Sequence, residues 1–218
     1  MNISIILAGG NSRRFANSIP KQYQSLMGRE IISFSVEAMK ESVLTDRILI
    51  VSDRDSVNRL AETYGVLCIE GGDSRNASLR NAIDYIHDHY PECINVLINE
   101  AARPFLTAEI VDEYYGYLSV FEGVITAQYL SDSLGREGEA VTLRDEYYLI
   151  QAPEAFRFQL LYRYFSAQSP ITATVQHLPK DRKVKMHFNF RNNMKITYPE
   201  DMIIAEELMK LRNINGCT

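Results

Sequence analysis

The sequence contains few cysteines, and they are not arranged as a disulfide or metal-binding motif. Its three cysteines lie far apart, without a C-x-x-C spacing: Cys68, Cys93 and Cys217. This usage argues against a disulfide framework or a zinc site and is typical of a reducing compartment, so we expect a cytoplasmic protein. The four histidines show no metal-ligand pattern either. His87 and His89 lie two residues apart in an expected helix, where their side chains point to different sides.

The sequence also lacks a surplus of basic residues and a long hydrophobic run. The formal net charge of the 218 residues is −5, and no basic stripe is present. Because duplex nucleic acid is bound largely through Lys and Arg side chains that neutralise phosphates, we expect no nucleic acid partner. The apolar run that opens the chain covers six or seven residues before Gly9, and no basic residue precedes it. It is too short for a signal peptide or a membrane span, so we expect no membrane association.

What remains is an ordinary globular composition, with 46% hydrophobic and 23% charged residues. The length suits one α/β domain, and no repeat, low-complexity tract or linker divides residues 1–218. Short apolar runs alternate with helical patterns, which is typical of buried strands covered by helices. The expected strands span 3–8, 47–52, 66–70, 95–99 and 124–128. The expected helices span 31–41, 55–64, 78–89 and 108–121. This alternation predicts right-handed βαβ units and a doubly wound, mostly parallel sheet in a three-layer αβα sandwich.

The alternation breaks after the fifth expected strand. The stretch 131–148 is polar and contains glycine, and residues 140–143 and 147–150 alternate weakly between apolar and polar. We expect a protruding hairpin at about 130–150, with its turn near 136–139. The elements expected after it are a helix at 156–167, a strand at 184–190 and a final helix that begins near Pro199.

The first strand runs into a glycine-rich, basic segment. Gly9 and Gly10 allow the backbone to approach a ligand closely, because neither has a Cβ atom. Free backbone amides there, together with Arg13, Arg14 and Lys21, would form a compact cradle for a polyanion. The segment matches neither a P-loop nor the dinucleotide-binding G-x-G-x-x-G motif. The alternative is an ordinary turn with solvated basic residues. The position beyond the carboxyl end of a strand, where α/β folds bind ligands, favours phosphate binding.

Five motifs occur in a fixed order along almost the whole chain. They are Leu7-Ala8-Gly9-Gly10 with Arg13-Arg14 and Pro20-Lys21-Gln22; Gly71-Gly72-Asp73-Ser74-Arg75-Asn76-Ala77-Ser78; Glu100-Ala101-Ala102-Arg103-Pro104; Gln151-Ala152-Pro153-Glu154-Ala155-Phe156; and Asn193-Met194-Lys195-Ile196-Thr197 with Pro199-Glu200-Asp201. Together they resemble the signature of the 2-C-methyl-D-erythritol 4-phosphate and D-ribitol 5-phosphate cytidylyltransferase family. The resemblance implies a Rossmann-like nucleotidyltransferase fold with a protruding β-arm. It also implies an enzyme that joins CTP to a small phosphorylated alcohol and releases pyrophosphate.

The resemblance implies a role for each matching residue. Arg14, Lys21 and Lys195 match catalytic residues that contact the α-phosphate, where negative charges converge in the transition state. The residues that match the nucleotide-binding set are Leu7, Ala8, Gly9, Gly10, Asn11, Gly71, Gly72, Asp73, Ser78 and Ala101. The family also implies Mg²⁺ bridging the phosphates and a homodimer joined through the arm.

The residues implied to bind the acceptor are Glu100, Arg103, Ser133 and Arg144, and Glu100 is also the candidate metal ligand. On this side the sequence departs from the family pattern. Glu replaces Asp at 100, and the threonine-lysine pair after Asp132 becomes Ser133 and Gly135. The remaining departures are Ala152 for Thr, Ala173 for Asp and Asn192 for Asp. A site built for hydroxyl groups discriminates strongly between acceptors. The departures therefore weigh against methylerythritol phosphate and keep ribitol phosphate, glycerol phosphate or another small alcohol phosphate open.

Other interpretations of the same residues stay open at this point. Ser78 could cap the helix that follows it, and Lys195 and Arg144 could be ordinary surface cations. A guanylyltransferase of the molybdenum-cofactor type shares the LAGG start, but Phe15-Ala16 does not match the Met-Gly expected there. A regulatory protein that binds nucleotide without turnover is a further alternative.

Overall fold

The computed structural model describes residues 1–10, 15, 19–138 and 142–215, and the side chains up to residue 212. Its centre is a seven-stranded sheet in the order β5-β4-β1-β6-β8-β7-β9. The strands are β1 (Asn2–Leu7), β4 (Arg47–Ser52), β5 (Leu67–Glu70), β6 (Asn95–Glu100), β7 (Gly123–Tyr129), β8 (Tyr148–Arg157) and β9 (Val184–His187). β8 runs antiparallel to both of its neighbours, whereas the other neighbouring strands are parallel. The expected doubly wound, mostly parallel mixed sheet is therefore confirmed.

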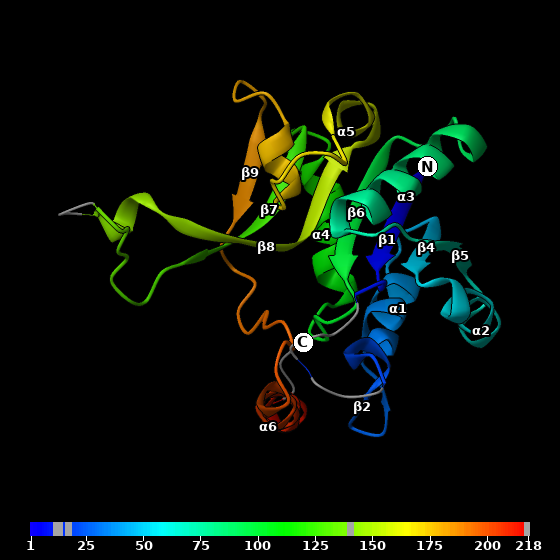
Figure 1. Cartoon of the computed structure of the whole chain (residues 1–218), viewed down its shortest axis with the longest axis horizontal. Helices are drawn as coiled ribbons and strands as arrows, with labels where there is room; N and C mark the ends of the chain where they lie inside the picture. The colour runs from blue at the N-terminus through cyan, green and yellow to red at the C-terminus, as the bar shows by residue number, and fades with distance from the viewer. Residues whose placement is uncertain (11–14, 16–18, 139–141, 216–218) are drawn as a thin grey trace.

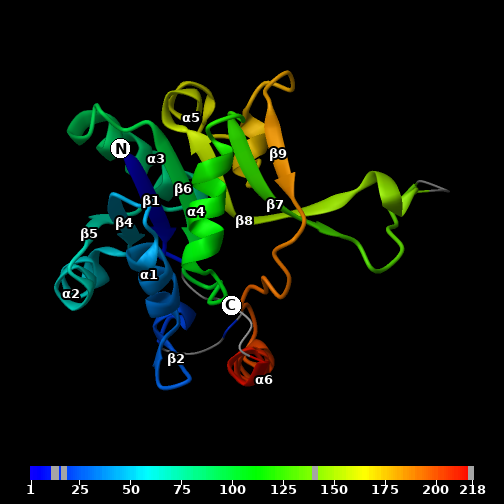
Figure 2. The same cartoon turned by 180° about the vertical axis from the view of Figure 1, so that it is seen from behind.

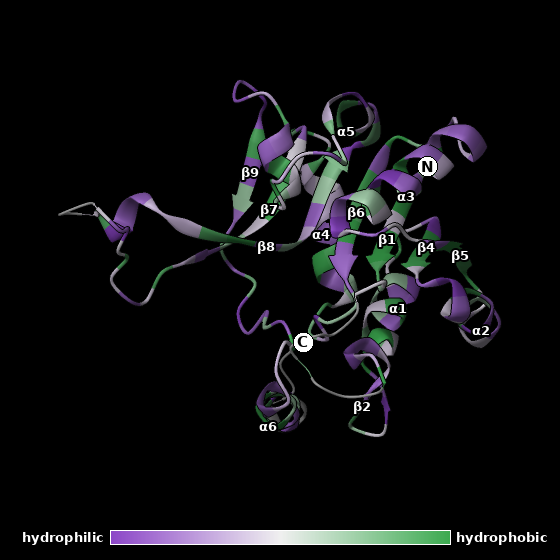
Figure 3. Ribbon diagram, in the orientation of Figure 1, coloured by the Kyte–Doolittle hydropathy of each residue, from purple (hydrophilic) through white to green (hydrophobic). Residues whose placement is uncertain are grey.

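Helices cover both faces of the sheet (Figures 1 and 2). Helices α1 (Ile31–Glu41), α2 (Arg54–Tyr64) and α4 (Ala108–Tyr117) contribute to one buried apolar cluster. Helices α3 (Arg75–His89) and α5 (Phe158–Tyr164) contribute to the other. The central strands are apolar because they are buried on both faces, as the hydropathy colouring of β1 and β4 shows (Figure 3). Among the described helices, none is long and apolar enough to cross a membrane.

A third apolar cluster lies at the end of the sheet where β1 and β6 finish. It joins the short hairpin β2 (Ser25–Leu26) and β3 (Arg29–Glu30) to helix α6 (Glu200–Asn215). Phe105 and Ile196 are buried in this cluster, so the carboxyl ends of the central strands are framed by the hairpin on one side and α6 on the other (Figure 1). The remaining short elements are the 3-10 turns η1 (Lys21–Tyr23), η2 (Arg144–Glu146) and η3 (Thr174–His177).

The described residues of the segment 130–147, which are 130–138 and 142–147, project from the body as an arm at the outer ends of β7 and β8 (Figure 1). Its strand pairing ends at Tyr129 and Tyr148, which face one another. The hairpin was expected to continue at 140–143, but residues 142 and 143 belong to no strand, and 140 and 141 lie outside the described residues. Of the expected turn at 136–139, residues 136–138 lie in the arm, and residue 139 lies outside the described residues. The described part of the arm protrudes as expected.

The helix expected at 156–167 is wrong at both ends, because it starts later and already ends at Tyr164. Phe156 is a fully buried residue of β8, and the helix begins only at Phe158. Pro153 hides this strand in the sequence, because proline cannot donate a ladder hydrogen bond. The structure accommodates it with a bulge: the pairing with β7 passes from Glu154 directly to Gln151, across the cis Ala152–Pro153 bond.

Candidate active site

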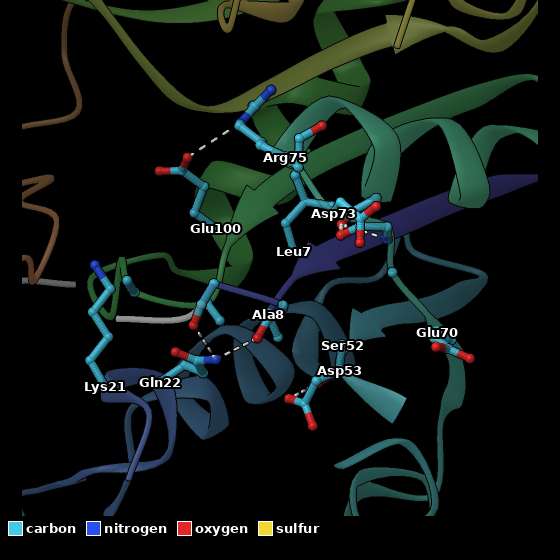
Figure 4. A pocket seen from close by; sticks show the side chains of 18 of the residues that line it. Leu7, Ala8, Lys21, Gln22, Ser52, Asp53, Glu70, Asp73, Arg75 and Glu100 are labelled. Atoms are coloured by element: carbon cyan, nitrogen blue, oxygen red, sulfur yellow. Dashed lines mark hydrogen bonds and ion pairs between the residues drawn. The ribbon is translucent and has the colours of Figure 1, made fainter. Parts of the chain in front are cut away.

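A cleft of about 850 Å³ opens at the carboxyl ends of β1, β4, β5 and β6 (Figure 4). This is the edge of a doubly wound sheet at which ligands bind. The described lining residues are Leu7, Ala8, Gly9, Gly10, Lys21, Gln22, Ser52, Asp53, Arg54, Glu70, Gly71, Gly72, Asp73, Ser74, Arg75, Ser78, Glu100, Ala101, Ala102, Lys195 and Thr197. The cleft therefore brings together every described residue that was expected to bind the nucleotide. Asn11 and Arg14 lie outside the described residues.

The loop after β1 is held in place by Gln22. The Gln22 amide donates to the carbonyl oxygen of Ala8 at 2.5 Å and to that of Gly10 at 3.3 Å, and its side chain is buried. The amide of Ala8 in turn donates to Val51 on β4 at 2.8 Å. Gln22 belongs to the Pro20-Lys21-Gln22 motif, but the sequence alone indicated no function for it. The structure shows that it fixes the backbone that faces the cleft.

Gly71 and Gly72 form a second loop, pressed against the start of α3. A Cβ atom on Gly71 would lie 2.7 Å from the Ser78 hydroxyl, and one on Gly72 would lie 2.5 Å from the Cβ of Ala77. The loop is closed by Ser78, whose hydroxyl accepts from the Gly72 amide at 3.1 Å and donates to the Gly72 carbonyl at 3.3 Å. The two glycines are needed because the helix packs too closely for any side chain.

Ser78 does not cap helix α3. The cap is Ser74, whose hydroxyl accepts from the amide of Ala77 at 3.0 Å. Ser78 lies one turn into the helix, where it is buried and binds the glycine loop. The capping interpretation of Ser78 was therefore wrong, and its position in the cleft wall agrees with the nucleotide-side expectation. Ser74 and Asp73 also line the cleft, so the amino end of α3 faces it.

Two lysines enter the cleft from different segments. Lys21 lies in η1, and its ammonium group donates to the carbonyl of Ile196 at 2.6 Å. Lys195 precedes Ile196, and its ammonium group lies 2.9 Å from the carboxylate of Glu100. The amide of Ile196 donates to Ala102 at 2.9 Å, which ties the Lys195 segment to the end of β6. The two cations are thus held at one side of the cleft by a shared stretch of backbone.

Glu100 is surrounded by three cations. Its carboxylate lies 2.9 Å from Lys195, 3.1 Å from Arg103 and 3.5 Å from Arg75. Burial by itself would raise the pKa of Glu100, but the positive charges of Lys195, Arg103 and Arg75 outweigh it and lower the pKa to about 2. The carboxylate is therefore ionised at neutral pH. Within the part of the chain that the structure describes, no group of three His, Cys, Asp or Glu residues could hold a metal ion.

Three of the expected acceptor residues do not line the cleft. Arg103 is buried beside it, where the guanidinium donates to Glu100 and, at 2.8 Å, to the carbonyl of Asn193. Ser133 and Arg144 lie in the exposed arm, and Arg144 donates to Ser131 at 3.1 Å. Their expected contacts with an acceptor stay predictions.

Sequence reasoning assigned no function to several residues that shape the cleft. Arg75 faces Glu100 across the cleft (Figure 4), and Tyr23 donates or accepts a 2.5 Å hydrogen bond with Ser52. Glu154 is buried in β8 and pairs with Arg75. Both residues belong to motifs of the family pattern, Arg75 to Gly71–Ser78 and Glu154 to Gln151–Phe156, so the sequence already marked them as candidates. What was missing is their proximity, because they come from distant elements.

This arrangement suits the binding of a small polyanion. Two glycine-rich loops present backbone to the cleft, two lysines supply positive charge, and a carboxylate stands between the cations. Such a site can hold phosphates and stabilise charge that develops on them, with no nucleophilic side chain required.

Comparison with known proteins identifies relatives of the whole chain. Residues 2–211 match the family of 2-C-methyl-D-erythritol 4-phosphate cytidylyltransferases. The 2-C-methyl-D-erythritol 4-phosphate cytidylyltransferase of Clostridium kluyveri is 26% identical, with 96% of each chain covered. A bifunctional ribulose 5-phosphate reductase/CDP-ribitol pyrophosphorylase of Haemophilus influenzae is 30% identical, over 97% of this chain and 49% of that protein. The crystal structure of 4-diphosphocytidyl-2C-methyl-D-erythritol synthase from Anaerococcus prevotii has the same fold, with a TM-score of 0.81, 23% identity and 96% of each chain covered.

Proposed function

The chain belongs to the 2-C-methyl-D-erythritol 4-phosphate cytidylyltransferase family, and we propose that it transfers CMP from CTP to a small polyol phosphate, such as ribitol 5-phosphate or 2-C-methyl-D-erythritol 4-phosphate. The observation that carries the proposal is the cleft itself. It unites the loop after β1, the Gly71–Ser78 loop, Lys21 and Lys195 at one edge of the sheet. Neither a guanylyltransferase nor a non-catalytic nucleotide-binding protein gains support from the relatives that match.

In the proposed reaction a phosphate oxygen of the acceptor attacks the α-phosphorus of CTP. The new P–O bond forms as the bond from the α-phosphorus to the bridging oxygen of the β-phosphate breaks, and pyrophosphate leaves with that electron pair. No side chain becomes covalently bound. Lys21 and Lys195 neutralise charge on the α-phosphate as it accumulates, and Glu100 holds the Lys195 ammonium group in place at 2.9 Å. Arg14 is proposed as a further α-phosphate contact on the strength of the family motif.

Cytosine is proposed to bind against the Gly71–Gly72 loop. The loop has no side chain to keep a base away from its backbone, and the hydroxyl of Ser78 fixes the Gly72 peptide from behind. Backbone carbonyls and amides can then pair with the edge of a small pyrimidine. A purine or uracil would leave some of these groups unpaired, at about 1 to 3 kcal/mol for each buried group.

Magnesium is proposed to arrive with CTP and to neutralise its phosphates. The donor set of the cleft fits such an ion, because Mg²⁺ is commonly held by one or two carboxylates together with substrate phosphates. Glu100 is the carboxylate that would contribute, since it is ionised and lines the cleft. It is already paired with three cations, so the phosphates would supply most of the ligands.

The acceptor is proposed to lie beside Glu100 and Lys195. The departures from the family pattern do not all face it. Ala152 is buried and its carbonyl accepts from Asn193 at 2.7 Å, and Gly135 lies in the exposed arm. Asn192 adopts a positive φ of 57°, a conformation that Asn and Asp both tolerate better than most residues, so either side chain suits the backbone at this position. The relative from Haemophilus influenzae, which is named for CDP-ribitol, makes ribitol 5-phosphate the first acceptor to test.

A homodimer is proposed from the surface of the arm. Large apolar residues are exposed in the single chain both in the arm (Leu134, Leu143 and Tyr147) and on the paired strands at its base (Tyr129, Tyr148 and Leu149). Exposed aromatic and aliphatic side chains on paired strands are commonly covered by a symmetric partner. A second chain would also bring Ser133 and Arg144 of one arm towards its neighbour, which would give these two residues the acceptor role that they lack in the single chain. The reaction is proposed to take place in the cytoplasm, where Cys68 and Cys93 would remain the free thiols that they are here.

The test is pyrophosphate release with each of the four nucleoside triphosphates and Mg²⁺. The acceptors are ribitol 5-phosphate, 2-C-methyl-D-erythritol 4-phosphate and glycerol 3-phosphate. Release that requires both CTP and one polyol phosphate is expected. UTP is the most demanding competitor, because it differs from CTP only at ring positions 3 and 4. Equal use of UTP, a preference for GTP, or no release with any pair would contradict the proposal.

A further inference from the structure

Arg75 is the first residue of helix α3, directly after the Ser74 cap. Its side chain is 23% exposed and lines the cleft, but it does not point freely into solvent. It is the residue that links the Gly71–Ser78 loop to the opposite wall of the cleft, as Figure 4 shows for its pairing with Glu100. None of the roles derived above uses it.

The Arg75 guanidinium contacts three separate segments. Its Nε lies 3.5 Å from Glu100 at the end of β6, and one terminal nitrogen lies 3.6 Å from Glu154 in β8. The other terminal nitrogen donates to the carbonyl of Thr172 at 2.7 Å. A guanidinium has donors on three edges of a rigid plane, so it can hold three partners in fixed directions. A lysine ammonium group is a point charge without this geometry.

Glu154 completes the arrangement from the sheet. Its side chain is 2% exposed, and its two oxygens accept from the amides of Thr174 at 3.1 Å and Val175 at 2.9 Å. The neighbour of Arg75, Asn76, donates to the carbonyls of Ser169 at 3.0 Å and Ile171 at 2.7 Å. The segment 169–175 is therefore held by the amino end of α3 on one side and by β8 on the other.

We propose that Arg75 is a positioning residue for the acceptor polyol phosphate: it orients the Glu100 carboxylate and holds the backbone of residues 172–174 beside it. The inference rests on the proposed function. Removal of Arg75 should affect the acceptor and CTP differently. The Gly71–Gly72 loop, where cytosine is proposed to bind, is closed by Ser78 and not by Arg75. Lys195 and Arg103 still contact Glu100 without Arg75, and the phosphates would supply most of the Mg²⁺ ligands, so loss of the guanidinium should leave CTP binding nearly unchanged. It should loosen the Glu100 side of the cleft, where the acceptor would bind.

The test compares Arg75→Met and Arg75→Lys with wild type, using whichever of the three acceptors wild type turns over best. The matched control is Arg80→Met, which removes an arginine of the same helix that pairs with Asp84 outside the cleft. A loss of acceptor orientation is expected to lower kcat/KM for the acceptor on the order of 10²-fold. The Kd for CTP is expected to change less than about threefold, well under 1 kcal/mol. Arg75→Lys should recover only part of the loss, and Arg80→Met should lose none.

A second measurement does not depend on turnover. Amide hydrogen exchange of residues 171–176 is expected to accelerate in Arg75→Met, while exchange in the sheet stays unchanged. An unchanged KM and kcat for the acceptor, an equal loss of CTP binding, full recovery by lysine, or unchanged exchange would each overturn the proposal. If wild type itself releases no pyrophosphate with any acceptor, the proposed function fails, whereas the exchange result still decides whether Arg75 holds this segment.

Discussion

The ammonium group of Lys195 lies 2.9 Å from the carboxylate of Glu100, although the first residue belongs to the segment before α6 and the second ends β6. The same carboxylate also contacts Arg103 and Arg75. One acidic side chain thus joins the helix after the glycine loop, the end of a central strand and the segment that carries a proposed catalytic lysine. The negative charge of Glu100 therefore stabilises the fold and also positions the cations of the cleft.

Glu100→Gln is expected to lower the stability at neutral pH. The pKa of Glu100 is lowered from 4.5 to about 2 in the folded chain. A depressed pKa of this size corresponds to on the order of 3 kcal/mol of stability. This contribution is fully present above pH 4.5 and is lost as the pH falls through about 2. Denaturant unfolding at pH 7, 4 and 3 should therefore show a difference from wild type that shrinks with acidity. Glu70→Gln, which breaks an exposed pair with Arg54, should change stability by at most about 1 kcal/mol.

Lys21→Ala is expected to reduce turnover much more than stability. Loss of one preorganised charge at the α-phosphate typically lowers kcat about 10²- to 10³-fold. The matched control is Lys40→Ala, because Lys40 also donates to a backbone carbonyl, that of Tyr64, but lies on the exposed end of α1. Steady-state kinetics and thermal unfolding measure the two effects. Normal turnover in Lys21→Ala would refute the proposed role.

Gly72→Ala is expected to weaken CTP binding. Its Cβ atom would lie 2.5 Å from the Cβ of Ala77, so either the loop or the helix must move. Gly116→Ala is the control, because nothing lies within 4 Å of a Cβ atom there and alanine favours the α4 helix. Calorimetric titration with CTP should show a Kd raised at least tenfold, which is 1.4 kcal/mol, for the first variant alone. Unchanged affinity would place the base elsewhere.

The chain is expected to form a dimer through the arm. Light scattering at micromolar concentration should give twice the mass of one chain. Leu149→Asp places a charge among the exposed apolar residues at the base of the arm and should shift the protein towards the single-chain mass. Val120→Asp changes an apolar residue on the body that is even more exposed than Leu149, and it should not shift the mass. A monomer for wild type would contradict the prediction.

Elements with regular patterns were predictable from the sequence. Helix α1 and strand β4 have the predicted bounds, because α1 repeats apolar residues at helical spacing and β4 is a short continuous apolar run. Helix α3 begins three residues earlier than predicted, since its polar first turn, capped by Ser74, carries no apolar signal. Helix α4 and strand β9 end three to four residues before their predicted ends, where the chain turns although its composition stays apolar.

The cleft was predictable in its residues but not in its connections. The structure brings the described nucleotide-side residues into one cleft, and their contacts with a nucleotide stay predictions. Asn11 and Arg14 lie outside the described residues. The pairing of Arg75 with Glu154 was not predictable, because it depends on β8 entering the middle of the sheet against both neighbours. Pro153 argues against a strand in the sequence, and nothing in the sequence shows that the Glu154 carboxylate is buried. Arg103 shows the converse, since its match to the family did not reveal that it packs behind Glu100.

Tyr129 and Tyr148 pair at the base of the arm, so the arm can be removed or replaced between these two residues. Two directly opposed residues on antiparallel strands can be joined by a two-residue turn such as Asn-Gly. Residues 130–147 can therefore be exchanged for such a turn, or for an arm of another length, without altering the order of β6, β8 and β7 or the position of Glu154. Such an exchange would remove Ser133 and Arg144 together with the rest of the arm, so it would separate what the body of the fold does by itself from what the arm supplies.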